Sequence, residues 1–73
     1  MMTCAEAYEA IYADLMKMKK AEIVQQGVAW KIYSSDPRCG EYVLKNFDKK
    51  GIAHHVADRA AWNMVRLGTP VML

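Results

Sequence analysis

Two cysteines, Cys4 and Cys39, are the residues of this sequence best suited to covalent chemistry. Cys39 follows Asp36 and Pro37, and an aspartate cap followed by proline at the first helical position is a common helix start. The thiol would then lie in the first helical turn, where free backbone N–H groups and the helix dipole favour the thiolate. Cys39 is therefore a candidate nucleophile. The alternative is a small apolar residue packed near the helix start.

The other potential ligands and nucleophiles give weaker signals. Cys4 also lies at a predicted helix start, but no neighbouring residue suggests a site. Two cysteines are too few for a disulfide framework, so we predict that both are reduced. His54 and His55 are adjacent, and adjacent residues on a strand point to opposite faces, so we predict hydrogen-bonded histidines and no metal site.

The charge pattern bears on the class of partner. The net charge is +2, with ten basic residues mixed among eight acidic ones. Nucleic-acid binding prefers a dense basic patch, so the sequence predicts no nucleic-acid partner. Arg59, Asn63 and Arg66 share one face of a predicted helix. They either meet a carboxylate, such as glutathione supplies, or form a solvated face.

Length and composition indicate one small globular domain. The chain has 73 residues, of which 53% are hydrophobic and 25% are charged, which argues against disorder. No apolar run approaches the roughly 20 residues that span a membrane. No basic segment followed by an apolar stretch marks a secretory signal. The sequence therefore predicts a cytoplasmic protein without a membrane partner.

A capping-box pattern begins the first predicted element. Thr3 and Glu6 can each satisfy a free N–H at a helix start. Apolar residues then recur at helical spacing: Tyr8, Ile11, Tyr12, Leu15 and Met18. This pattern predicts a helix over residues 4–26 with Gly27 as its stop. Ile23 and Val24 lie off the main stripe, so a second apolar side or an early break remains open.

The rest of the chain alternates between strand-like and helix-like patterns. Apolar residues alternate over residues 28–34, which predicts a strand, and a helix follows over 37–50. The remaining patterns predict a second strand over residues 52–57, a third helix over 58–68 and a last short strand over 69–73. A strand–helix–strand unit implies parallel strands with a right-handed crossover. The predicted fold class is therefore α/β.

On these elements, residues 28–73 resemble the glutaredoxin-like branch of the thioredoxin fold. Four segments carry the resemblance, in order along the chain: the strand ending in Tyr33, Pro37-Arg38-Cys39-Gly40, Lys50-Gly51-Ile52 and Thr69-Pro70-Val71. The last segment is similar to the family's cis-proline turn. The resemblance implies a small thioredoxin-like sheet containing a βαβ unit within a single domain, residues 1–73, in which residues 1–27 form an additional N-terminal helix.

The resemblance also implies an activity. Cys39 would be the catalytic nucleophile, and Gly40, Tyr42, Thr69 and Pro70 would lie beside the substrate. Tyr42 stands where many members carry a second cysteine, which is similar to the single-cysteine glutaredoxins that use glutathione to resolve the mixed disulfide. The implied activity is glutathione-dependent thiol–disulfide exchange with glutathione or a protein thiol as partner and no required cofactor. Iron–sulfur binding by paired domains is a lesser implication.

Other readings of the sequence remain open. The family continues beyond the position of Leu73, so its glutathione site would be incomplete or rebuilt here. One alternative is a non-catalytic protein-binding module on the same fold, which docks a partner through the first helix or a sheet edge. Another is a small helical DNA-binding domain over residues 36–67, which lacks a basic recognition face. The apolar first helix and the edge near Leu73 also predict a homodimer.

Overall fold

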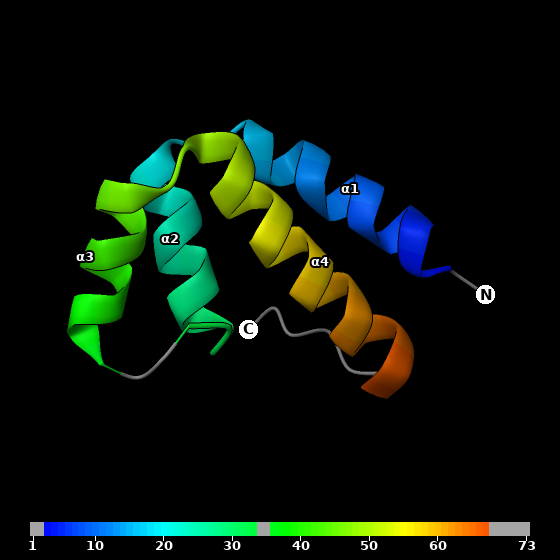
Figure 1. The fold of residues 1–73 in the computed structure, drawn as a ribbon. Coiled ribbons are helices and arrows are strands. Elements are labelled where there is room, and N and C mark those ends of the chain that lie inside the picture. Colours follow the sequence, from blue (N-terminus) through cyan, green and yellow to red (C-terminus); the bar gives the residue numbers. More distant parts are fainter. Residues whose placement is uncertain (1–2, 34–35, 68–73) are drawn as a thin grey trace.

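The computed structural model describes residues 3–33 and 36–67, and this part of the chain folds into four helices without a strand (Figure 1). The helices are α1 (Cys4–Met16), α2 (Lys20–Ala29), α3 (Pro37–Asn46) and α4 (Lys49–Leu67). The described chain is all-α, so the predicted α/β fold and the resemblance to the thioredoxin-like, glutaredoxin-like family are wrong. The predicted strand over residues 69–73 and the predicted cis-proline turn lie outside the described residues.

Both starts that the capping residues predicted are confirmed. At α1, the N–H of Glu6 donates to the Thr3 hydroxyl at 3.1 Å, and the N–H of Thr3 donates to the Glu6 carboxylate at 3.4 Å. At α3, the Asp36 carboxylate accepts from the N–H of Arg38 at 3.0 Å, and Pro37 occupies the first helical position. Local side-chain chemistry therefore fixed these two boundaries.

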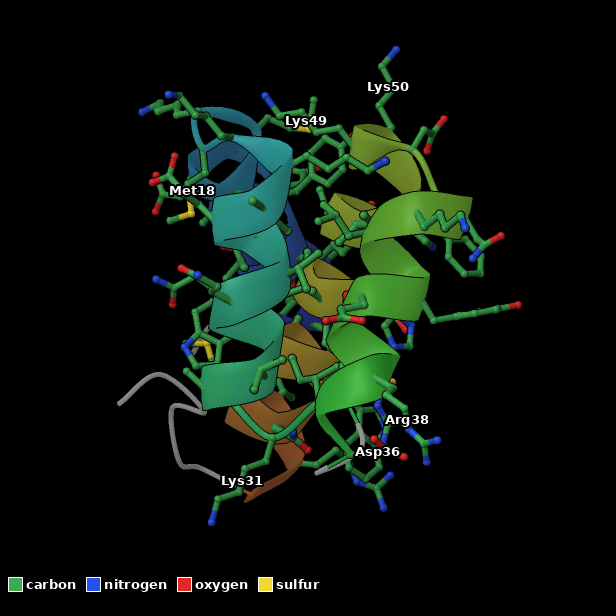
Figure 2. The ribbon with its side chains drawn as sticks, turned by 90° about the vertical axis from the view of Figure 1, so that its left-hand side faces the viewer. Met18, Lys31, Asp36, Arg38, Lys49 and Lys50 are labelled. Atoms are coloured by element: carbon green, nitrogen blue, oxygen red, sulfur yellow. The ribbon has the colours of Figure 1, made fainter. Side chains whose placement is uncertain are left out.

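The helix predicted over residues 4–26 divides into two, which confirms the open alternative of an early break. α1 ends at Met16, and α2 begins at Lys20 after a three-residue turn. The Lys19 N–H donates to the Glu22 carboxylate at 3.1 Å at the new start. Lys49, at the start of α4, donates to the Met16 carbonyl oxygen at 2.9 Å, so the end of α1 is tied to α4 (Figure 2).

The strand predicted from residue 28 is wrong because α2 runs through Gly27 and ends only at Ala29. Gly27 is buried inside the helix and does not stop it. Trp30 is buried, whereas Val28 is 47% exposed. The apolar alternation that suggested a strand thus arises at a helix end, where Trp30 turns into the core and Val28 faces outward.

α2 ends in a Schellman turn that places a lysine in the left-handed backbone region. The Ile32 N–H donates to the Gly27 carbonyl oxygen at 2.9 Å, and the Lys31 N–H donates to that of Val28 at 3.0 Å. Lys31 has a φ of 56°, which glycine adopts at little cost. We expect Lys31→Gly to raise the free energy of unfolding by about 1 kcal/mol, measured by urea denaturation. A loss of stability would contradict this account of the turn.

The predicted strand over residues 52–57 and the predicted helix over 58–68 are wrong because both segments belong to α4, a single helix of 19 residues. Asp48 accepts a hydrogen bond from the Gly51 N–H at 2.7 Å and so caps this helix. Gly51 therefore lies in the first turn of α4, and the helix predicted over residues 37–50 ends earlier, at Asn46.

The core forms where α1 and α2 pack against α4. Six buried residues recur at helical spacing on α4 and are mostly alanine: Ile52, Ala53, Val56, Ala57, Ala60 and Ala61. Ala7, Ile11 and Leu15 of α1 face them, while α2 also contacts α3. The apolar face predicted for α1 is confirmed, but the domain itself covers much of it. The predicted homodimer stays a prediction.

Candidate functional site

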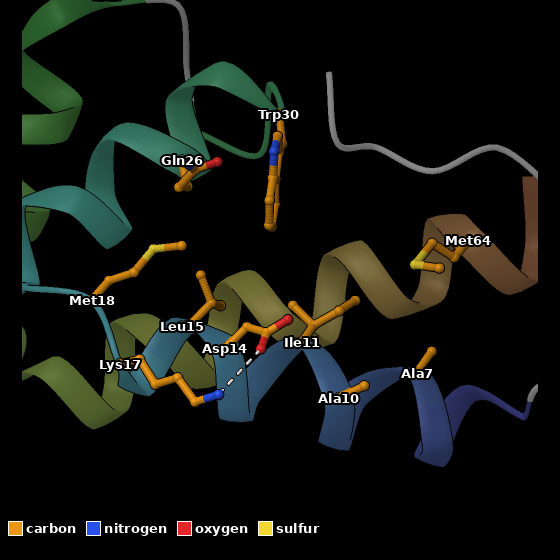
Figure 3. A pocket seen from close by; sticks show the side chains of 10 residues that line it. All are labelled: Ala7, Ala10, Ile11, Asp14, Leu15, Lys17, Met18, Gln26, Trp30 and Met64. Atoms are coloured by element: carbon orange, nitrogen blue, oxygen red, sulfur yellow. Dashed lines mark ion pairs between the residues drawn. The ribbon is translucent and has the colours of Figure 1, made fainter.

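An open groove of about 670 Å³ lies between α1, α2 and α4 (Figure 3). It forms because α1 and α2 share a short turn and then diverge across α4, so the surface between them stays uncovered (Figure 1). Seven apolar residues line it: Ala7, Ala10, Ile11, Leu15, Met18, Trp30 and Met64. Three polar residues complete the lining: Asp14, Lys17 and Gln26.

The walls of the groove come from different helices. The Trp30 ring points from the end of α2 toward α1, where it faces Ile11 (Figure 3). Met18 lies at the end where α1 and α2 meet, and Met64 of α4 lies at the opposite end. Methionine side chains are unbranched and adapt to differently shaped partners. The groove therefore has a rigid aromatic wall and two adaptable ends.

The polar groups of the groove lie at its rim. Asp14 and Lys17 form an ion pair at 3.9 Å, and both side chains are exposed. An exposed pair of this kind contributes little to stability. An apolar floor with a few polar groups at its edge is typical of binding sites. The arrangement is suited to binding an apolar surface.

The predicted nucleophile lies elsewhere. Cys39 is half-buried in the first turn of α3, and its N–H donates to the Asp36 carbonyl oxygen at 2.9 Å. The pKa of the Asp36 carboxyl is lowered mainly by a hydrogen bond from the Arg38 side chain and, to a smaller extent, by one from the Arg38 backbone N–H. The placement of Cys39 in a helix start is confirmed. Its reactivity and glutathione-dependent exchange stay predictions, now without the fold that implied them.

The other predicted substrate-binding residues do not gather around Cys39. A Cβ atom at Gly40 would lie 3.5 Å from the Val24 side chain, so this part of α3 faces α2. Tyr42 is 61% exposed and meets Phe47 edge-on, with ring centroids 6.3 Å apart. Thr69 and Pro70 lie outside the described residues. Within the described part, α3 thus directs its predicted site residues to different surfaces.

The Tyr33 ring packs over Gly27, and it stacks on His55 with centroids 5.7 Å apart. Its hydroxyl is buried and forms no hydrogen bond within the described residues. Burial, and secondarily the negative charge of ionised Cys39, raises the pKa of Tyr33 to about 12.

This shift predicts an alkaline loss of stability. At pH values between the unfolded pKa of about 10 and the folded pKa, Tyr33 keeps its proton in the folded state but loses it in the unfolded state. Tyr33 ionisation therefore leaves stability unchanged below about pH 10 and lowers it as the pH rises toward 12. We expect Tyr33→Phe to remove this part of the slope and to change stability by less than about 1 kcal/mol at neutral pH. Denaturant unfolding across this range measures both, and identical slopes in the two proteins would contradict the assignment.

The two adjacent histidines face different neighbours. His54 Nδ1 lies 2.6 Å from the Tyr8 hydroxyl of α1, while His55 stacks on Tyr33. Their separation was predicted from a strand, but it arises from the turn of α4 between consecutive residues. The described residues contain no cluster of three or more potential metal ligands.

Comparisons with known proteins assign no role to the groove. No protein-family model, curated protein or solved structure matches this chain. Across residues 3–33 and 36–67, no helix is both long and apolar enough to cross a membrane.

Sequence reasoning missed the groove. One available signal was the series of small residues on α4, which marks a face for close helix packing, with Ala53 and Ala57 one turn apart. A second was the pair of alanines, Ala7 and Ala10, beside the apolar stripe of α1. Neither signal gives the angle at which α1 and α2 diverge.

Proposed function

We propose that this domain is a non-catalytic protein-binding module that takes the apolar face of a partner's α-helix into the groove between α1, α2 and α4. The observation that carries the proposal is the groove itself, about 670 Å³ in volume and lined by seven apolar residues with polar groups at the rim. Docking through the first helix was one of the readings that the sequence left open.

The shape of the groove favours a helix as its occupant. α1 forms one side of the groove, Gln26 and Trp30 at the end of α2 form the other, and Met64 of α4 lies at one end. A space between two diverging helices is a position that a further helix takes in a bundle. The lining on α1 extends from Ala7 to Leu15, or about 12 Å at the rise of a helix, and Lys17 and Met18 in the following turn continue it. Three turns of a partner helix cover that length and present apolar anchors at i, i+3 or i+4, and i+7.

The two tryptophans allow a direct test. Trp62→Phe leaves Trp30 as the single tryptophan, so its emission reports on the groove. The variant is titrated with a helical peptide whose leucines occupy one face, and with a peptide of the same composition whose leucines are scattered around the helix. We expect a saturable shift of Trp30 emission with the first peptide alone. Unchanged Trp30 emission with both peptides would contradict the proposal.

Two alanines on α1 test whether the peptide binds in the groove. Ala10 lines the groove, whereas Ala13 is exposed outside its lining. We expect Ala10→Lys to weaken peptide binding at least about tenfold, because it places a charge against an apolar partner. Ala13→Lys should change affinity less than about twofold. Equal effects of the two substitutions would place binding elsewhere.

Sedimentation across a dilution series tests whether a second copy of the chain, and not a partner's helix, occupies the groove. The proposal predicts that self-association, if it occurs, is unaffected by Ala10→Lys. A dimer that this substitution dissociates would replace the partner helix with the homodimer predicted from the sequence.

A further inference from the structure

Two arginines of α4 flank an exposed tryptophan. Trp62 is 43% exposed. The guanidinium carbon of Arg59 lies 5.8 Å from the centroid of its ring, and that of Arg66 lies 5.2 Å from it. Both distances fall within the range of cation–π attraction. We call Arg59, Trp62 and Arg66 the Arg–Trp ridge.

The charges of the ridge have no carboxylate partner in the described part of the chain. The ion pairs found there join Asp14 to Lys17 and Asp36 to Arg38. The indole restricts the positions of both guanidiniums, so less side-chain freedom is lost when a carboxylate binds them. The ridge thus presents two oriented cations beside an apolar ring.

The ridge is separate from the groove between α1 and α2. Met64 is the residue of α4 that lines the groove. Trp62 stands two positions away, about 200° around the helix. Val65, which is also 43% exposed, adds apolar surface on the outer side of α4. The ridge therefore offers a second surface that does not depend on the proposed function of the groove.

We propose that the Arg–Trp ridge docks an acidic amphipathic helix of a partner protein. Arg59 and Arg66 are seven residues apart, or about 10.5 Å along the helix axis. A partner helix lying alongside α4 has the same two-turn repeat. Carboxylates at its positions i and i+7 pair with the two arginines, and an apolar side chain at i+3 or i+4 packs on Trp62.

Charge favours an acidic peptide over a nucleic acid. A nucleic acid needs many basic contacts along its backbone. The ridge supplies two arginines, Asp58 adjoins it in sequence, and the whole chain has a net charge of only +2. Two carboxylates and one apolar anchor match what the ridge presents.

The test uses a fluorescein-labelled helical peptide with glutamates at i and i+7 and leucine at i+3, followed by fluorescence anisotropy with the full chain. We expect Arg59→Gln and Arg66→Gln each to weaken binding about threefold to tenfold. Lys45→Gln removes the same charge from α3 and should change affinity less than about twofold. Replacing both peptide glutamates with glutamine, or raising the salt concentration, should also weaken binding.

Three results would overturn the proposal. Equal weakening by Lys45→Gln and the arginine variants would show attraction to net charge alone. Unchanged affinity in Trp62→Ala, with helicity retained, would exclude the ridge. Tighter binding of a labelled single-stranded oligonucleotide than of the peptide would indicate a nucleic-acid surface. Ala10→Lys should leave binding to the ridge intact. The groove proposal and the ridge proposal can therefore be contradicted independently of each other.

Discussion

Replacing Leu15 with alanine should lower the free energy of unfolding by about 3–5 kcal/mol. Leu15 is 1% exposed and belongs to the core that α1 forms with α4. The substitution removes buried methyl groups and leaves a cavity that the surrounding helices fill only in part. A domain of this size has a total stability of about 4–11 kcal/mol, so much of the folded population should be lost near 37 °C.

Leu44 provides the matched control on α3, where it is 38% exposed. Leu44→Ala should cost clearly less, about 1–2 kcal/mol, because more than a third of the Leu44 surface is already in contact with water. Thermal and urea unfolding of the two variants measure the difference. A similar loss in both would contradict the packing of α1 against α4.

Gly27→Ala should destabilise the domain by about 1–3 kcal/mol, although alanine is the better helix former. A Cβ atom at this position would lie 2.8 Å from Cδ2 and 3.1 Å from Cζ of Tyr33. The ring also stacks on His55, so it has little room to retreat. The close approach of Tyr33 thus explains why a glycine lies inside α2.

Gly40 is the matched glycine of α3. A Cβ atom there would meet side chains only at 3.5 Å or more, which is ordinary contact. Gly40→Ala should therefore raise stability by up to about 1 kcal/mol. In a Tyr33→Ala background, Gly27→Ala should lose most of its cost, which a double-mutant cycle measures. A gain of stability in Gly27→Ala, or a loss in Gly40→Ala as large as that in Gly27→Ala, would contradict the placement of Tyr33.

The parts of the fold that could be predicted from the sequence are those fixed by local chemistry. Thr3 with Glu6, and Asp36 with Pro37, satisfy free N–H groups within one turn, so each start could be recognised from its residues alone. The apolar stripe of α1, including Ile11 and Leu15, could be recognised from its helical spacing.

The elements that could not be predicted depend on packing and hydrogen bonds that the apolar pattern of a segment does not specify. The pattern of residues 28–34 is that of a strand, but the turn at Lys31 is stabilised by hydrogen bonds to the end of α2 and by the packing of Tyr33 on Gly27. Residues 52–57 suit either a strand or a helix. Their burial against α1 within a helix of 19 residues decides the outcome.

The groove depends on the relative directions of whole helices. Trp30 and Ile11 are far apart in sequence, and no local pattern brings them to facing walls. The site predicted around Cys39 relied on the thioredoxin-like fold. In the all-α structure, Cys39, Gly40 and Tyr42 follow the turn of α3 and face different neighbours.

Amide chemical-shift mapping of the ¹⁵N-labelled chain during titration with the leucine-face peptide tests the binding of a helix in the groove most directly. We predict that the largest shifts occur along Ala7–Met18, at Gln26 and Trp30, and at Met64, and that α3 changes little. The same residues should stay unchanged with the scattered-leucine peptide. Shifts confined to α3 or to the Arg–Trp ridge, or no shifts at a saturating peptide concentration, would contradict the groove as the site of helix binding.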